Sequence, residues 1–148
     1  MNVDIDKLRM LGIRIIHGSL NTTPEFQNRP VPAHSFNFEF RDEAAHNMQE
    51  RKSRLRLYFN IEGQDKEGNS IGLNADYTLE YFYYVENLPD YFDKDGYVDG
   101  DFLANLIGIA YSTARGILLE RTQGTYFNGI VLPIINPSKF LREREKDN

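Results

Sequence analysis

Hydrophobic and polar residues alternate in several segments of the first 86 residues, which is the pattern of β-strands with one buried face. In residues 54–63 the apolar positions are Leu55, Leu57, Phe59 and Ile61, and the residues between them are mostly polar. A sheet with one apolar and one polar face is typical of antiparallel strands that are covered on one side. We therefore predict strands over residues 13–21, 36–40, 54–63 and 71–86.

The segments between these strands carry turn and loop signals. Residues 22–34 contain Pro24, Pro30 and Pro32, and three prolines in so short a span argue against a helix or a central strand. A connection of this length exceeds what a hairpin needs, and long ordered loops are often functional. Residues 41–52 are polar and fit either a loop or a short helical turn, while residues 64–70 are predicted to form a turn.

The spacing of apolar residues becomes helical after Gly100 and predicts one helix that ends near Arg121, with Gly124 as its cap. A second stripe of small or apolar residues lies on the opposite side of this helix. Its members are Ile109, Ser112, Gly116 and Leu119. A helix that is apolar on two sides usually has two partners, so we expect the sheet on one side and another subunit on the other.

The last part of the chain is apolar but interrupted. Residues 126–135 are too punctuated by Gly129 and Pro133 to form a central strand, and Pro137 follows directly. Residues 138–146 carry charges of both signs and predict a short final helix. Because the sequence contains no internal repeat, low-complexity tract or linker, we interpret residues 1–148 as a single domain.

Composition and charge narrow the class of protein. The chain has no cysteine, which excludes disulfides and thiol chemistry, and its net charge of −5 argues against a nucleic-acid partner and an anionic membrane surface. No apolar run approaches the roughly 18 residues that a membrane helix needs. Asp4 and Asp6 precede any basic residue, unlike in a secretory signal, so we predict a cytoplasmic protein without membrane insertion.

Motifs that carry catalytic or metal chemistry are weak or missing in the sequence. Residues 92–102 resemble a calcium loop at Asp93 and Asp95, but they lack the glycine and the final glutamate that such a loop requires. His17, His34 and His46 lie in separate segments without a metal-binding spacing. There is no nucleophile elbow, phosphate-binding loop or dinucleotide motif. We therefore predict neither an enzyme nor a bound cofactor or metal.

Two apolar segments broken by proline remain, residues 26–36 and residues 126–135. Composition favours loops that cover the core. Alternatively, both segments border a groove for an extended apolar peptide, which such grooves bind by pairing with a sheet edge and by pockets for alternate side chains.

The C-terminal third resembles the end of SecB-like chaperones, in which a helix with an Ala-Arg pair precedes a Gly-Thr-Phe-like loop and a Leu-Pro-Pro-x-Asn-Phe-like stretch. Ala114-Arg115 matches the first element, and Gly124-Thr125 with Tyr126 or Phe127 matches the second. Leu132-Pro133 through Asn136 matches the third. The order of elements is similar over roughly residues 13–141.

This resemblance implies an α+β fold with a four-stranded antiparallel sheet, covered on one face by a long helix, and a second short C-terminal helix. It also implies a homo-oligomer, either a dimer or a homotetramer built as a dimer of dimers through the helix stripe. Such proteins are ATP-independent holdases that bind unfolded polypeptide clients, including preproteins for export. The implied client-binding groove consists of Phe26, Val31, Phe36, Tyr126, Phe127, Ile130, Leu132 and Ile134.

The sequence departs from the export chaperones of this family at several points. The first strand lacks their Lys-Asp pair, and the acidic segment of residues 90–101 is longer. In those chaperones, acidic groups on the open sheet face dock a translocase motor, and the candidates here are Glu39, Asp76 and Glu80. Arg54 and Arg56 share that face. An alternative is therefore a SecB-like module dedicated to one partner, such as an antitoxin or a mobile-element protein.

Overall fold

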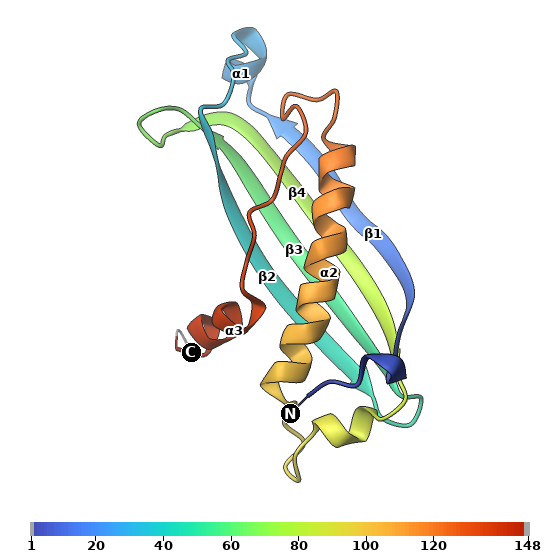
Figure 1. Cartoon of the computed structure of the whole chain (residues 1–148). Helices are drawn as coiled ribbons and strands as arrows, with labels where there is room; N and C mark the ends of the chain where they lie inside the picture. The colour runs from blue at the N-terminus through green and yellow to red at the C-terminus, as the bar shows by residue number, and fades with distance from the viewer. Residues whose placement is uncertain (1, 147–148) are drawn as a thin grey trace.

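A computed structural model describes residues 2–146, and the side chains of residues 2–144. It contains a single four-stranded sheet with a long helix laid along one face (Figure 1). The strands are β1 (Leu8–Thr22), β2 (Ser35–Asn47), β3 (Lys52–Gln64) and β4 (Ser70–Val85). They are antiparallel throughout, in the order β1-β4-β3-β2. The α+β fold class expected from the sequence is confirmed.

The two edge strands are longer than their sequence patterns predicted. β1 begins five residues before the predicted start. Of residues 41–52, predicted as a loop or helical turn, 48–51 form a turn, but 41–47 are the second half of β2. The prediction was wrong for residues 41–47 because polar residues also extend an edge strand when their backbone pairs with a neighbour. Arg41 lies opposite Tyr58, and pairing continues to Asn47 opposite Lys52.

The helices follow the sequence with one exception. α2 (Gly100–Arg121) begins where Asp99 accepts a hydrogen bond from the Phe102 N–H at 3.0 Å. α3 (Pro137–Lys146) closes the described chain, and Gly124 after α2 has a φ of +71°. The exception is α1 (Pro24–Asn28), a short helix in the proline-rich segment for which we predicted none. Pro24 occupies its first turn, where a missing N–H is tolerated.

The core lies between the sheet and α2. Leu55, Leu57, Leu79 and the inner faces of the neighbouring strands pack against the apolar side of α2. Two buried tyrosines in β4 keep their hydroxyls satisfied: Tyr83 donates to the Leu106 carbonyl at 3.1 Å, and Tyr81 accepts from Thr113 Oγ1 at 3.2 Å. Burial raises the pKa of Tyr81 to about 12, so both core hydroxyls stay protonated at physiological pH.

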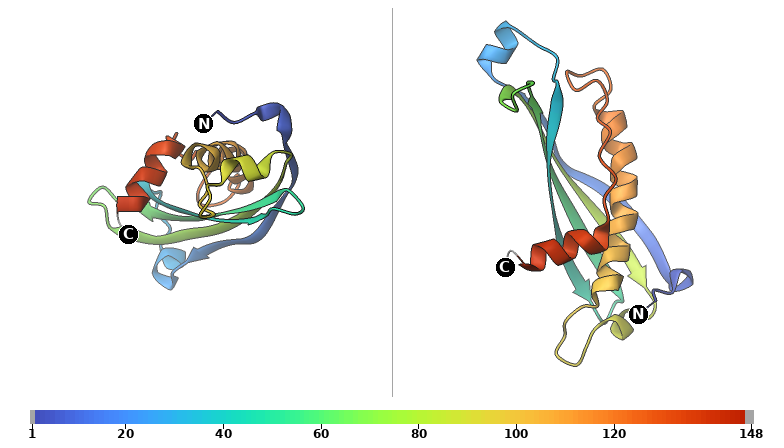
Figure 2. Two further views of the ribbon diagram at one scale, coloured as in Figure 1. Left: turned by 90° about the horizontal axis from the view of Figure 1, so that it is seen from below. Right: turned by 60° about the vertical axis from the view of Figure 1, so that its left-hand side comes forward.

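Both helices of the C-terminal half lie on the same side of the sheet, and much of the opposite face carries no helix (Figure 2). By length and composition α2 is apolar enough to cross a membrane, contrary to our reading of the sequence. Half of its most apolar stretch is buried inside the structure. A helix that packs its apolar side on a sheet meets the same length and composition test as a membrane helix, so α2 is explained by its place in the core.

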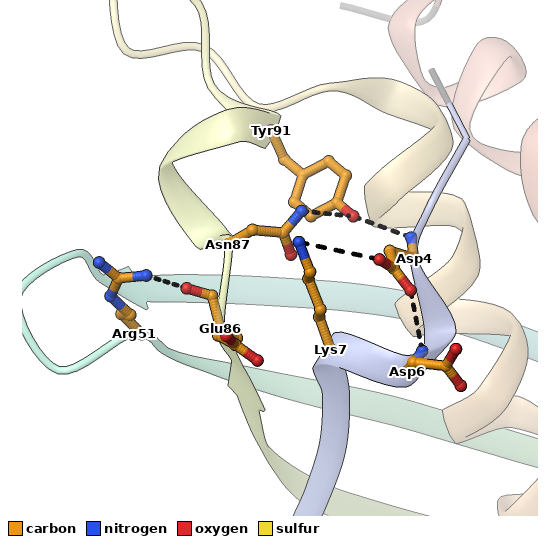
Figure 3. A network of polar contacts seen from close by, with 7 residues as sticks. All are labelled: Asp4, Asp6, Lys7, Arg51, Glu86, Asn87 and Tyr91. Carbon is orange, nitrogen blue, oxygen red and sulfur yellow. Dashed lines mark hydrogen bonds and ion pairs between the residues drawn. The ribbon is translucent and has the colours of Figure 1, made fainter.

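Short 3-10 helices close the end of the sheet at which β1 begins. They are η1 (Ile5–Lys7) and η2 (Leu88–Tyr91). The Asp4 N–H donates to the Tyr91 hydroxyl at 3.0 Å, and Asn87 Nδ2 donates to the same oxygen at 3.3 Å. Arg51 reaches the Glu86 carbonyl from the β2–β3 turn (Figure 3). The first residues are thereby tied to the connection between β4 and α2.

Candidate functional site

The two proline-broken apolar segments of the sequence meet in space at one end of the molecule. The Phe26 and Tyr126 rings lie edge to face with centroids 5.0 Å apart, and the Phe36 and Phe127 rings are 5.6 Å apart. The crossover between β1 and β2 is therefore joined by aromatic contacts to the loop that follows α2. The sequence analysis offered a groove bordered by both segments as one alternative, but the ring contacts that join them emerge only from the fold.

The residues predicted to line a groove divide into two groups by burial. Four belong to the core as the structure stands, namely Phe26, Phe127, Ile130 and Leu132. Phe36 is half-buried, whereas Val31, Tyr126 and Ile134 are exposed, Ile134 to 84%. A client that contacts the first group must displace part of the chain, while the second group is accessible without rearrangement.

Residues 128–136, which we call the strap, connect the loop after α2 to α3. The strap runs back along α2 on the side of β2 (Figure 1). Its first part is anchored at Thr122, a fully buried residue, which accepts the Ile130 N–H at its Oγ1 at 2.7 Å and the Gly129 N–H at its carbonyl at 3.0 Å. The pattern of the sequence did not reveal this role, because a threonine at a helix end is common.

Farther along, the strap is held by side chains of α2. Arg115 Nε donates to the Leu132 carbonyl at 3.2 Å, and the Tyr111 hydroxyl donates to the Pro133 carbonyl. Within the described residues, the strap forms no strand pairing with β2. The strap is therefore held by these two hydrogen bonds, by the two hydrogen bonds at Thr122 and by the burial of Ile130 and Leu132.

The predicted oligomer stripe lies on the outer side of α2. Ile109, Ser112, Gly116 and Leu119 are all exposed there, and Ile109 and Ser112 border a shallow hollow of about 620 Å³ next to Pro137. A row of small and apolar side chains on the outside of a core helix is available for contact with another molecule.

A second exposed apolar surface lies on β1 and was not recognised in the sequence. Ile13 and Ile15 lie opposite Tyr81 and Leu79 on the helix side of the sheet, yet both remain exposed. A register shift between Ile15 and His17 then moves His17 to the open face, opposite Thr78. The simple alternation that we expected over this strand was wrong at that bulge. Leu11, Ile16 and Leu20 extend the exposed apolar surface.

The three carboxylates considered for motor docking differ in their surroundings. The Glu80 side chain is only 7% exposed and lies 2.8 Å from Arg56 Nε, so its charge is already compensated. Asp76 accepts a hydrogen bond from Asn60 Nδ2 at 2.6 Å, and Glu39 is exposed. Asp76 and Glu39 both border a hollow of about 420 Å³ on the open face.

Groups with metal or acid–base potential have structural partners. Asp93 accepts the Asp95 and Tyr97 N–H groups, both at 2.9 Å, and so holds its own loop. His46 Nδ1 lies 2.7 Å from Ser53 Oγ, and burial lowers the pKa of its imidazole. Among residues 2–146 there is no group of three or more histidine or acidic side chains that could hold a metal ion.

The fold matches a known class: the chain has the fold of SecB-like chaperones, as the sequence resemblance implied. It is similar to the Mycobacterium tuberculosis Rv1957 SecB-like chaperone, solved in complex with a ChAD peptide from the Rv1956 HigA1 antitoxin. The TM-score is 0.60 at 11% identity, over 88% of this chain and 92% of that one.

A protein of unknown function from Streptococcus agalactiae is also similar, with a TM-score of 0.45 at 11% identity over 86% of this chain and 97% of the other. No family model and no curated protein matches the sequence. The likeness to known proteins is therefore one of fold.

Proposed function

We propose that this protein is a chaperone of the SecB-like type, which binds extended apolar segments of unfolded polypeptides without ATP and without covalent chemistry. The observation that carries the proposal is the aromatic junction between Phe26 and Tyr126 and between Phe36 and Phe127. It joins two segments that also expose apolar side chains. A peptide bound to the similar mycobacterial chaperone adds support for a polypeptide ligand.

Binding would come from burial of apolar client side chains, at roughly 25 cal/mol per Å² removed from water. Val31, Tyr126 and Ile134 offer the initial contact because they are already exposed. Ile130 and Leu132 become available only when the strap lifts from α2. A client that wraps around several subunits would gain affinity from many such weak contacts.

The test is suppression of aggregation of a reduced, unfolded client in a buffer without ATP. We expect the wild-type protein to keep the client soluble and the double variant Tyr126→Ser/Ile134→Ser to lose most of this protection. Tyr97→Ser is the control, because Tyr97 is a tyrosine on the acidic loop before α2 that is even more exposed than Tyr126. Lack of protection by excess wild-type protein, or equal loss in the control, would contradict the proposal.

A second candidate is a module dedicated to one partner, and the antitoxin peptide bound to the mycobacterial protein favours it. An antitoxin or a mobile-element protein would then occupy the same surface. A dedicated module would bind one peptide tightly and leave general clients unprotected, so the aggregation assay also separates these two candidates.

For the assembly we propose a homo-oligomer, a dimer or a tetramer, in the cytoplasm. The exposed apolar side of β1 and the stripe on α2 are two separate surfaces, which is what a dimer of dimers needs. Light scattering should show a multiple of the monomer mass, and Ile13→Lys/Ile15→Lys should lower it. Ile5→Lys, at another exposed isoleucine, should not change the mass. A monomeric wild type would contradict the oligomer.

We also propose a role in protein export, in which a translocase motor docks on the open face of the sheet. Glu39 and Asp76 are the acidic groups that the open face offers to a basic partner, since Glu80 is enclosed and paired with Arg56. Binding of the motor that is abolished by Glu39→Gln/Asp76→Asn would support it.

A further inference from the structure

The open face of the sheet is divided in charge, and one half of it is basic although the whole chain carries −5. The basic half lies toward the start of β1 and the start of β3. We call it the arginine patch, and it consists of Arg9, Arg14, Lys52, Arg54, Phe82 and Tyr84. The other half carries Glu39, Glu62 and Asp76.

Strand pairing sets the arginine patch in rows across the sheet. Arg9 and Lys52 flank Tyr84 from β1 and β3, and Arg54 lies opposite Phe82 in the next row. Two of the arginines stack on the aromatic rings: the Arg9 guanidinium carbon is 4.9 Å from the Tyr84 centroid, and that of Arg14 is 5.4 Å from Phe82. Stacking orients each guanidinium while leaving its edge free to donate.

The hydrogen-bond donors of the arginine patch are largely unused. Within the described part of the chain, Arg9 and Arg14 have no carboxylate within 4.0 Å. Arg54 Nη2 is 3.7 Å from Glu43, beyond hydrogen-bond distance, and Arg54 Nε is buried without a partner. In the next row Arg14 and Arg56 flank Glu80, and Arg56 Nε donates to this carboxylate. Arg9 and Arg14 thus present the accessible guanidinium donors, which suit carboxylate oxygens.

The spacing of the rows indicates the shape of a ligand. Successive rows on one face of a sheet are about 6.6–6.8 Å apart, which is also the spacing of alternate side chains in an extended peptide. An extended segment with acidic residues at alternate positions can therefore place a carboxylate near each arginine row. A nucleic acid fits less well, because Glu43 lies beside Arg54 and Glu50 beside Lys52, and the net negative charge of the chain repels a long polyanion.

We propose that the arginine patch is a docking surface for an extended acidic segment of a partner protein. This surface is on the face of the sheet opposite α2 and the strap, so it can be occupied while a client is bound. The proposal stands on the charge and geometry of the open face and does not depend on chaperone activity.

The experiment measures fluorescence anisotropy of a labelled short peptide of alternating Glu and Ser. We expect saturable binding to the wild-type protein that weakens as salt rises, and at least about tenfold weaker binding to Arg9→Gln/Arg14→Gln. Arg41→Gln is the matched control: Arg41 stacks on Tyr58 at 3.7 Å on the same face, but in the acidic half. The control should bind the peptide like wild type, and a peptide with Gln in place of Glu should not bind.

Thermal unfolding of each variant shows whether the substitutions leave the fold intact. We expect an intact fold, because Arg9 and Arg14 are both exposed. If the double variant is unstable, Arg9→Lys/Arg14→Lys keeps the charge and should bind detectably but more weakly. The proposal is overturned by absent binding to wild type, by equal loss in Arg41→Gln, or by tighter binding of a single-stranded oligonucleotide. Aggregation suppression by the same variants reports separately on the proposed function.

Discussion

The sheet ends in two edge strands, β2 and β1, and the chain itself covers only one of them. On β2 the side chains that face α2 are half-buried, and Phe40 contacts Phe59, Tyr111 and Phe140 with ring centroids 5.3, 5.5 and 4.7 Å apart. On β1 the corresponding side chains, Ile13 and Ile15, remain exposed. Two edges of one sheet therefore present opposite surfaces.

The C-terminal third of the chain causes this difference. After α2, the loop places Phe127 on Phe36, and α3 places Phe140 on Phe40. No described segment returns over the middle of β1, where apolar side chains and the outer backbone edge are both accessible. The β2 edge is thus covered by the protein's own C-terminal third. The β1 edge has the apolar composition of a surface that a second molecule covers.

The largest expected effect compares a truncation on each edge. Phe40→Ala should lower the free energy of unfolding by about 3 kcal/mol, because three aromatic contacts and their burial are lost. Ile15→Ala should lower it by less than about 1 kcal/mol, since this residue is already 36% exposed and makes no ring contact. Urea unfolding at low protein concentration, followed by circular dichroism, measures both. Equal losses of unfolding free energy in the two variants would contradict the claim that only the β2 edge is covered.

A smaller effect is expected where α3 is fastened to β2. The Asp42 carboxylate is 2% exposed and pairs with Arg144, whose side chain is 39% exposed. Arg144→Ala leaves this buried carboxylate without its cation and should lower the free energy of unfolding by about 1–2 kcal/mol, less than for a fully enclosed pair because Arg144 is partly solvated.

The exposed Arg142 on the same helix is the control, and Arg142→Ala should be close to neutral. Adding Asp42→Asn to Arg144→Ala should recover part of the loss, because it removes the uncompensated charge. If the double variant is no more stable than Arg144→Ala, the ion pair does not fasten α3.

The same comparison explains which parts of the fold the sequence predicted. The central strands β3 and β4 are paired on both sides and face α2, so burial imposes strict alternation from Leu55 to Ile61 and beyond. Helix α2 was predicted with its ends, because its apolar positions follow one period from Gly100 and Gly124 follows its last turn. The edge strands were predicted only in part: β1 contains a register shift at Ile16, and the end of β2 is polar.

The sequence indicated the two segments of the candidate site and, as one alternative, a groove bordered by both, but not the contacts that join them. Proline and aromatic residues mark the segments around Phe26 and Phe127, yet the ring contacts between them join residues about a hundred positions apart. Burial of the strap residues Ile130 and Leu132 depends on hydrogen bonds that Tyr111 and Arg115 donate to the strap, which no local pattern encodes. Interactions of this range follow from the topology and not from periodicity.

The smallest expected effect concerns the far end of β2, where His46 faces the helix side. Its ring lies against Phe92 with centroids 5.0 Å apart, and Nδ1 lies 2.7 Å from Ser53 Oγ. Burial lowers the pKa of His46 below its ordinary value of 6.5, because desolvation disfavours the imidazolium. Near and below pH 6.5 the unfolded chain therefore binds a proton at this position more readily than the folded chain does.

The free energy of unfolding should consequently decrease as the pH falls through 6.5, and His46→Gln should reduce this dependence. Urea unfolding at pH 7.5, 6.5 and 5.5 (about one unit on either side of the histidine value) measures the slope. His17→Gln is the control, because it makes the same replacement at an exposed histidine on β1. If the slope in His46→Gln equals that of the wild type, His46 is not a source of the pH dependence.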